Sequence, residues 1–302
     1  MSKTFKGTMI TIAATLCWGF SGISGQYLMA QGISVNLLTS LRLIIAGLVL
    51  TGLAFIKDKA TLTSLMSSGS NRVRLLIFAI CGLLANQYAY LQAIHYTNAG
   101  TATVLQYISP VLVLAYVSLK GRTLPTFSES LSIFLAILGT FLIATHGHLA
   151  SLAITPLGLF WGVLSAFTYT AYMIIPAKLI QSYGSLTIVG LGMLIGGLVF
   201  PIFTQAWRYR LPLNSLNLLA LFGLIVVGAI LSYTLFLKGI SMVGPLKGSL
   251  LAAIEPVASV ILAALILGQV FYQMDILGML FIVLAVLIIS LRDLIISRKK
   301  SL

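Results

Sequence analysis

Five long stretches of this chain contain no lysine, arginine, aspartate or glutamate. They cover residues 7–41, 75–119, 130–177, 179–207 and 211–237. A helix that crosses the hydrocarbon core of a bilayer needs about 20 apolar residues, so several stretches are long enough for two crossings. Only 8% of the 302 residues are charged, whereas soluble domains carry roughly 25%. The sequence therefore predicts an all-α, polytopic membrane protein.

Ten membrane spans can be placed on this pattern. Their expected ranges are 8–30, 34–56, 74–95, 99–119, 127–145, 157–180, 184–206, 216–237, 247–267 and 273–293. Most connections are short and contain Gly, Ser, Asn or Pro, as turns between antiparallel neighbours do. The Ser- and Thr-rich segment 57–74 is longer and is expected to form a small surface loop. The first apolar stretch exceeds the core of a secretory signal, so we expect it to remain as a span.

The second half of the sequence repeats the first. When the halves are aligned, Ser109-Pro110 falls opposite Glu255-Pro256, and Ala93-Ile94 falls opposite Gly239-Ile240. Each aligned proline lies inside an apolar span, where it removes an amide donor and interrupts the helix. A duplicated apolar unit with a broken helix at the same place in each copy is typical of secondary transporters, which build a central site at such breaks.

Each repeat, expected at residues 1–148 and 149–302, contains five spans. Because five is odd, the second copy must enter the membrane from the opposite side, which predicts an inverted-topology repeat. Basic residues indicate the orientation. If the first residue is inside, 15 of the 18 Lys and Arg residues lie on inner connections, 2 lie outside and Arg42 lies within a span. The positive-inside rule therefore predicts that both termini are cytoplasmic in a bacterial plasma membrane.

Two charged side chains and two prolines mark the predicted interior. Glu255 lies inside a span, where a charge costs a few kcal/mol or more and normally faces a cavity or a partner. It is either a site for a proton or a substrate amine, or a structural carboxylate that binds backbone amides freed by Pro256. Arg42 could extend to a surface, pair with a carboxylate or backbone carbonyls, or contact substrate. Pro110 and Pro256 are the predicted hinges.

The side chains expected along a substrate pathway are mainly polar or aromatic. In the unusually polar third span, residues 88, 92 and 95 share one face at i, i+4 and i+7 spacing, so this face should contact protein or water. Aromatic groups with few fixed charges suit a moderately apolar organic solute. The candidate residues are Trp18, Asn86, Tyr88, Gln92, His95, Gln106, Tyr169, Tyr172, Tyr233 and Glu255.

The motifs do not support several other classes of function. The net charge of +13 comes from basic residues between apolar spans, so it does not predict nucleic-acid binding. The sequence has no Walker motif and no Cys/His metal spacing, so we expect no cofactor, no metal and no ATP-driven step. Gly19-Phe20-Ser21-Gly22 matches the Gly-x-Ser-Gly of intramembrane proteases, with His95 as a possible base. Ten duplicated spans do not fit that fold.

With these residues in view, the sequence resembles the ten-span EamA-type permeases of the drug/metabolite transporter superfamily. The resemblance is carried by Leu16-Cys17-Trp18-Gly19, Arg42, Asn98-Ala99-Gly100-Thr101-Ala102, Ser109-Pro110 and Glu255-Pro256-Val257-Ala258. It implies a basket of ten helices in which spans one, three, four, six, eight and nine surround a central cavity, while spans five and ten pack apart from it. It also implies a substrate among amino acids, other metabolites or toxic organic compounds, often moved outward.

The expected function is a secondary-active permease and not an enzyme. It would move a small organic metabolite, an amino acid or related compound, across the plasma membrane by alternating access, with export as the expected direction. Protons are the candidate coupling ion. The alternatives are an uncoupled facilitator of the same solutes and an intramembrane hydrolase. The expected partners are the solute and the lipid bilayer, and the protein would be a monomer or a homodimer.

The inverted repeat can be tested at the two ends of the chain. In a background with Cys17 and Cys81 replaced by alanine, Ser2→Cys and Ser301→Cys should both react with a membrane-impermeant maleimide in inside-out vesicles. Neither should react in right-side-out vesicles, because an even number of crossings returns the chain to the side on which it started. Labelling of the two ends from opposite faces would contradict the antiparallel arrangement of the halves.

Overall fold

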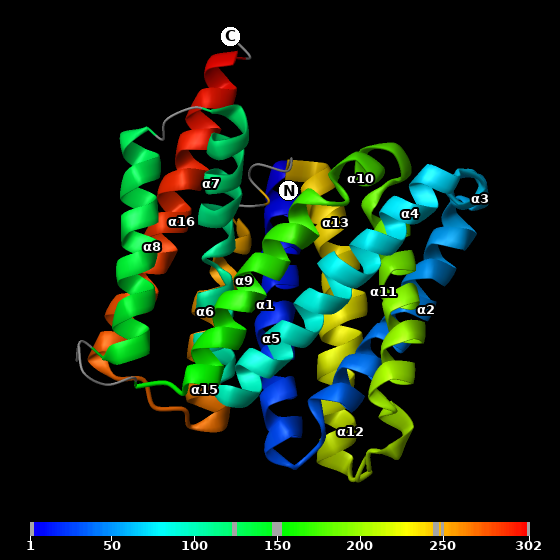
Figure 1. Ribbon diagram of the computed structural model, residues 1–302, viewed down its shortest axis with the longest axis horizontal. Coiled ribbons are helices and arrows are strands. Elements are labelled where there is room, and N and C mark those ends of the chain that lie inside the picture. Colours follow the sequence, from blue (N-terminus) through cyan, green and yellow to red (C-terminus); the bar gives the residue numbers. More distant parts are fainter. Residues whose placement is uncertain (1–2, 123–125, 147–152, 244–247, 249–250, 301–302) are drawn as a thin grey trace.

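The structure is a computed structural model that describes residues 3–122, 126–146, 153–243, 248 and 251–300. Every regular element in these ranges is a helix. Figure 1 shows that α1 begins and α16 ends at the same end of the bundle, which is called the terminal end below. The elements of the first half are α1 (Lys3–Ala30), α2 (Val35–Lys57), α3 (Lys59–Ser67), α4 (Gly69–Ile77), η1 (Phe78–Leu84), α5 (Ala85–Tyr96), α6 (Ala99–Gln106), α7 (Ser109–Gly121) and α8 (Phe127–Thr145).

The second half follows the same plan. Two short segments, η1 and its counterpart η3, are π-helices, and η2 is a single 3₁₀ turn. The elements of the second half are α9 (Pro156–Ile174), α10 (Ala177–Tyr183), α11 (Ser185–Thr204), η2 (Ala206–Arg208), α12 (Ser215–Phe222), η3 (Gly223–Leu231), α13 (Ser232–Val243), α15 (Ile254–Leu267) and α16 (Gln273–Lys300).

The predicted helical membrane architecture is confirmed. Eight helices, or unbroken runs of helix, in the described ranges are long and apolar enough to cross a membrane. Two shorter apolar helices, Ile254–Leu267 and Gln273–Ile288, lie where the ninth and tenth spans are expected. Part of the expected ninth span, 247–267, falls outside the described residues. Ten complete crossings therefore stay a prediction.

The expected surface loop at 57–74 is wrong, because this segment is helical. Asp58 starts α3 by accepting hydrogen bonds from the Thr61 amide at 3.0 Å and the Thr61 hydroxyl at 2.6 Å. Both hydrogen bonds lower the pKa of the Asp58 carboxyl, and the bond from the hydroxyl has the larger effect. After Ser68, α4 continues without a break into η1. Asp58 and Ser68 occupy the N-cap positions of α3 and α4, and both residue types are also common in loops.

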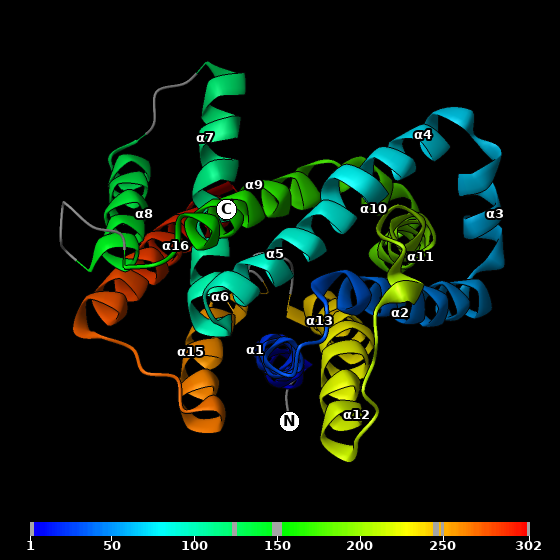
Figure 2. The same ribbon diagram turned by 60° about the horizontal axis from the view of Figure 1, so that its bottom comes forward.

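Corresponding helices of the two halves run in opposite directions. In Figure 1, α1 runs away from the terminal end, whereas its counterpart α9 runs towards it and leads into α10 there. Figure 2 shows α1 and α9 on either side of α5 and α6, near the centre of the molecule. The direction reversal is the geometry that an odd number of crossings per repeat requires.

Contacts between the halves occur in matched pairs. Helix α1 packs on η3, α13 and α15, and its counterpart α9 packs on η1, α5 and α6. The two largest contacts join equivalent elements directly, α2 with α11 and α8 with α16. Exchanging the two halves therefore reproduces the same set of neighbours. This arrangement is a pseudo-two-fold, with the axis passing between α2 and α11 and between α8 and α16.

Glycines allow the two self-matched pairs to approach closely. A Cβ added at Gly197 would lie 2.6 Å from the Ile44 amide nitrogen, and one at Gly47 would overlap the Leu194 amide nitrogen. In the other pair, a Cβ at Gly139 would lie 2.5 Å from the Gly278 carbonyl oxygen. Lipid tails are as apolar as the side chains, so helix association in a membrane depends on such tight packing between small residues.

This packing predicts a difference between two glycine substitutions. Gly197→Ala should destabilise the protein by about 1–3 kcal/mol, because the new methyl group must displace the α2 backbone. Gly52→Ala, also in a long membrane helix, meets no heavy atom within 4 Å and should leave stability unchanged or slightly increased. Thermal unfolding of both purified variants in detergent measures the difference. Equal Tm values would show that the α2–α11 contact is looser than described.

Candidate functional site

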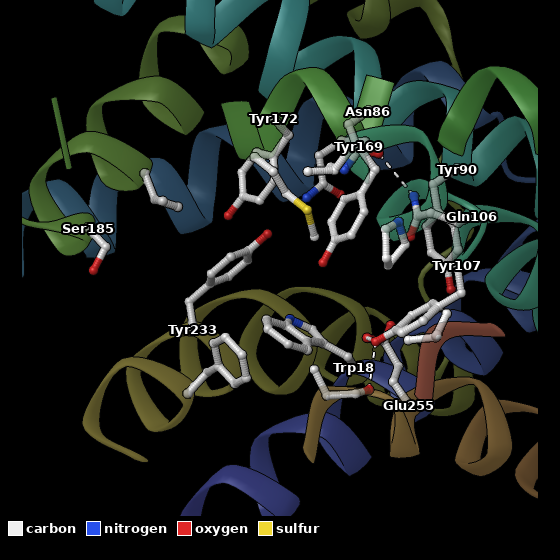
Figure 3. A pocket seen from close by; sticks show the side chains of 18 of the residues that line it. Trp18, Asn86, Tyr90, Gln106, Tyr107, Tyr169, Tyr172, Ser185, Tyr233 and Glu255 are labelled. Carbon is white, nitrogen blue, oxygen red and sulfur yellow. Dashed lines mark hydrogen bonds between the residues drawn. The ribbon is translucent and has the colours of Figure 1, made fainter. Parts of the chain in front are cut away.

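A cavity of about 680 Å³ lies between the two halves, and both halves supply its wall. Figure 3 shows that each side of the space carries side chains of both halves: Tyr169, Tyr172, Asn86 and Gln106 lie on one side, and Trp18, Tyr233 and Glu255 lie on the other. The polar and aromatic lining residues are Trp18, Arg42, Asn86, Gln87, Tyr90, Gln106, Tyr107, Glu129, Tyr169, Tyr172, Ser185, Tyr233, Phe236 and Glu255. Six of the seven aromatic residues in this list, all except Tyr107, lie in helices that the sequence alignment pairs with each other. Arg42 also lies in such a helix.

Broken helices border the cavity where the prolines predict them. Helix α6 ends at Gln106 and α7 begins at Ser109, with Pro110 in its first turn and in the cavity wall. In the second half, Glu255 and Pro256 lie in the first turn of α15. The first turn of a helix favours a negative charge, because its amide groups lack intrahelical partners. The breaks are present, while their role as hinges stays a prediction.

The two π-helices occupy matched positions, each directly before a helix that lines the cavity, α5 or α13. In the alignment, Leu75 pairs with Leu219, a separation of 144 residues, whereas Ala93 pairs with Gly239, a separation of 146. The difference of two residues equals the difference in length between η1, with seven residues, and η3, with nine. After the π-helices the separation is 146 residues, so Gln87 pairs with Tyr233, and both residues line the cavity. π-helices free backbone groups from the usual ladder and often occur at functional sites.

One region of the cavity presents a carboxylate within a polar group of side chains. The Tyr107 hydroxyl lies 2.9 Å from Glu255 Oε2 and 2.6 Å from the Ala252 carbonyl oxygen, so its single proton can serve either acceptor. Nearby, Gln106 Nε2 donates to Asn86 Oδ1 at 3.0 Å. Figure 3 shows Glu255, Tyr107, Gln106 and Asn86 gathered in one part of the pocket.

Aromatic rings form the rest of the wall. Trp18 packs edge-on against Tyr233 with ring centres 5.4 Å apart and lies 4.7 Å from Phe236. Across the pocket, Tyr169 and Tyr172 stack at 5.6 Å. The hydroxyl groups of Tyr172 and Tyr233 point towards each other (Figure 3). This wall offers flat apolar faces and a few hydroxyl groups to a bound molecule.

Arg42 is buried in the cavity wall, with 5% of its surface exposed. Its Nη2 donates to the Gly228 carbonyl oxygen of η3 at 3.2 Å, and its Nε has no hydrogen-bond partner. Within the described residues, no carboxylate lies within 4.0 Å of its guanidinium group, Glu255 included. Of the uses the sequence leaves open for Arg42, the structure therefore supports contact with a backbone carbonyl.

Seven of the ten predicted pathway residues line this cavity, and three do not. Tyr88 packs between Trp161 and Phe200, and its hydroxyl accepts a hydrogen bond from Gln92 at 2.7 Å. His95 is exposed beside Tyr96. At 100° per residue, positions 88, 92 and 95 lie about half a turn of α5 from positions 86 and 90, which face the cavity. The three residues share a face of α5, as predicted, but this face is turned away from the cavity.

Six of the polar and aromatic lining residues were not predicted from the sequence: Gln87, Tyr90, Tyr107, Glu129, Ser185 and Phe236. Gln87 and Tyr90 lie in the same polar span as Asn86, and Tyr107 follows Gln106 directly, so all three were within reach of the same argument. The pairing of Gln87 with Tyr233 in the repeat alignment is the signal that could have found it. The contribution of Glu129 from α8 has no such signal, because that span is expected to pack away from the cavity.

The protease-like motif does not form a catalytic pair. The Ser21 hydroxyl donates to the Leu224 carbonyl oxygen at 3.3 Å, and no hydrogen bond joins it to His95 in the described part of the chain. The same ranges contain no cluster of three or more His, Cys, Asp or Glu side chains that could hold a metal ion.

The cavity extends from the middle of the bundle to the terminal end. Its wall includes Ser185, the first residue of α11, and Ile180 of α10, and both helices meet at that end (Figure 1). A second hollow of about 400 Å³ shares Ser185 and Leu237 with it and is bordered by the exposed Lys57. The two hollows together form a path towards the surface at the terminal end.

The opposite end of the bundle is closed by side chains from both halves. Gln26 of α1 accepts a hydrogen bond from the Ala99 amide at 2.8 Å and donates to Gln269 at 3.4 Å. The Phe271 ring packs directly on Gly100, where an added Cβ would lie 2.8 Å from it. None of these five residues lines the cavity.

Comparison with known proteins identifies the class. A sequence model of the EamA-like transporter family matches residues 5–145 and again residues 156–291. YicL of Salmonella typhimurium, described as an uncharacterized inner membrane transporter, is 40% identical over 293 residues, which cover 96% of this chain and 97% of YicL. An uncharacterized transporter of Clostridium kluyveri is 23% identical over 306 residues, which cover 94% and 92% of the two chains.

A solved crystal structure shares the fold. It superposes with a TM-score of 0.64 at 18% sequence identity, covering 95% of this chain and 98% of the other. The protein is thus a multi-pass membrane transporter built from two homologous halves. It belongs to the EamA-like transporter family.

The direction in which the cavity opens can be tested by cysteine reactivity. In the background without Cys17 and Cys81, Tyr172→Cys should react with a charged, impermeant thiol reagent added at the terminal side. Leu213→Cys, in the exposed loop before α12, should react from the other side and serves as the control for sidedness. Reaction of Tyr172→Cys from the side of Leu213 alone would mean that the closed and open ends are exchanged.

Proposed function

We propose that this protein is a secondary-active permease that exports a small organic metabolite, an amino acid or related compound, by alternating access. The observation that carries this proposal is a single cavity walled by matched elements of both halves, with a path to one end of the bundle and a closed opposite end. Two halves of equal construction and opposite direction can exchange conformations, which would open the same cavity to the other side.

The cavity favours a small organic solute over a bare ion. Its volume lies in the range of pockets that enclose small molecules. Rings from Trp18, Tyr169 and Tyr233 supply apolar faces, while the hydroxyl and amide groups around Glu255 supply hydrogen-bonding partners. An ion site would instead bring several oxygen ligands to one point.

Charge distribution supports a cytoplasmic terminal end. Lys57, Arg72 and Arg74 lie at or next to α3 and α4, which Figure 1 places at that end, and Lys178 lies in α10 there. The opposite end carries Arg208, the last residue of η2, and Arg210, two residues after it. An excess of basic residues marks the cytoplasmic side of membrane proteins. The cavity would then face the cytoplasm and load solute from inside the cell, as an exporter in the plasma membrane must.

Glu255 is the proposed coupling residue. It is buried, it lines the cavity, and its one described side-chain partner is a neutral tyrosine hydroxyl. A carboxylate in this setting can exchange a proton with the cavity or hold a substrate amine. The structural alternative, in which it binds amides freed by Pro256, lacks a hydrogen bond of that kind among the described residues. Without coupling, the same cavity would serve a facilitator.

The coupling role predicts the behaviour of Glu255→Gln. The solute would first be identified by comparing metabolites inside and outside cells with and without the gene. In proteoliposomes, Glu255→Gln should keep solute exchange but lose accumulation driven by an imposed pH gradient, because glutamine carries no exchangeable charge. Asp58→Asn, which changes a carboxylate outside the membrane, is the matched control.

Two outcomes would decide against coupling. An unchanged pH profile in Glu255→Gln would eliminate the proton role of this residue. Wild-type transport that does not respond to a pH gradient would favour the facilitator instead.

A further inference from the structure

The cavity holds a fixed positive charge that no described carboxylate contacts directly. Arg42 is the sole lysine or arginine among the described residues that line it. Of the five N–H donors of its guanidinium group, the structure gives a protein acceptor to one, through the Gly228 carbonyl, while the buried Nε has none. An ion removed from water without a partner is strongly unfavourable, so a buried arginine normally faces an anion.

The carboxylates that the structure describes are engaged elsewhere. Asp275 pairs with His146 at 2.7 Å at the opposite end, and Asp58 accepts hydrogen bonds from Thr61 at the start of α3. Glu129 binds Thr126 at the start of α8, and Glu255 accepts from Tyr107. None of these four lies within 4.0 Å of Arg42. An anion in direct contact with Arg42 would then come from outside these groups.

The π-helix η3 holds Arg42 in position for such an anion. The Gly228 carbonyl oxygen accepts one proton from Nη2 at 3.2 Å and one from the Ser232 hydroxyl at 2.8 Å. This contact fixes one point of the guanidinium plane and leaves its other donors for a ligand. A planar guanidinium group binds a carboxylate through two parallel hydrogen bonds, which a lysine cannot reproduce.

We propose that Arg42 is the anion subsite of the cavity and that the transported solute carries a carboxylate bound to it. This inference rests on the proposed transport function and narrows its substrate class. The aromatic wall around Trp18 and Tyr169 holds the apolar body of the solute. Free organic acids and amino acids share this chemistry, and the experiment below separates them.

The test uses two matched sets of three compounds each. The first set is L-phenylalanine, 3-phenylpropanoate and phenethylamine, and the second is L-leucine, 4-methylpentanoate and isoamylamine. Binding to the purified protein in detergent is followed by the rise in Tm. We expect the wild-type protein to be stabilised by compounds that carry a carboxylate and not by the amines. If the amino acids alone stabilise the protein, binding also requires the amine of the solute. If the two organic acids stabilise it as well, the carboxylate is sufficient.

Arginine variants connect the effect to this side chain. Arg42→Gln should weaken carboxylate binding roughly 10- to 150-fold, the loss expected for a charge-assisted hydrogen-bonded pair. Arg42→Lys should give an intermediate affinity, and Arg74→Gln, at an exposed arginine of α4, should bind as the wild type does. If Arg42→Gln does not fold, the wild-type comparison of acids with amines still decides.

Failure of this inference differs from failure of the transport proposal. Stabilisation by amines as strong as that by carboxylates, or unchanged carboxylate affinity in Arg42→Gln, would overturn the anion subsite and leave transport of another solute class standing. Absence of stabilisation by all six compounds would also overturn the subsite as stated here. Absence of solute movement in the proteoliposome assay would remove the transport function on which it rests.

Discussion

The fold depends on the cost of leaving a backbone amide or carbonyl unpaired in hydrocarbon. That cost confines every interruption of a helix to places covered by protein or open to water. The break between α6 and α7 and the start of α15 release backbone groups at the wall of one cavity, and each π-helix ends two residues before a residue of that wall, Asn86 or Tyr233. The cavity therefore gives the released backbone groups polar surroundings within the membrane, and these groups supply hydrogen-bonding partners to the cavity.

Duplication supplies the frame, and divergence between the copies supplies the charge. The alignment that pairs Gly47 with Gly197 places Gly192 opposite Arg42, and Ser109 is the counterpart of Glu255. Arg42 and Glu255 thus each occur in one half without an ionic counterpart in the other. Gly192 packs against the Phe78 ring instead, so a second arginine would not fit there. The two halves can share a backbone plan while presenting different chemistry to one solute.

Much of this arrangement could be predicted from the sequence. Charge-free stretches predict the spans, and the repeated prolines predict the breaks beside Gln106 and Glu255. The face of α5 could not be chosen in the same way, because spacing groups 88, 92 and 95 together without saying which side of the helix meets the cavity. A π-helix rotates the following helix about its axis by an amount that depends on the length of the π-helix. Its hydrogen bonds produce no residue pattern from which that length could be predicted. Helix α3 depends on one capping aspartate, a residue equally common in loops.

The closure at the end away from the termini consists of neutral amides and one aromatic ring. Each hydrogen bond made by Gln26 contributes about 0.5–1.5 kcal/mol, and among the described residues Gln26 itself contacts no ion pair, although His146 and Asp275 join the two halves at the same end. Hydrogen bonds of this strength are weak enough for thermal motion to break them. The two hydrogen bonds of Gln26 together contribute about 1–3 kcal/mol, which is within the range that the differential binding of one solute can offset.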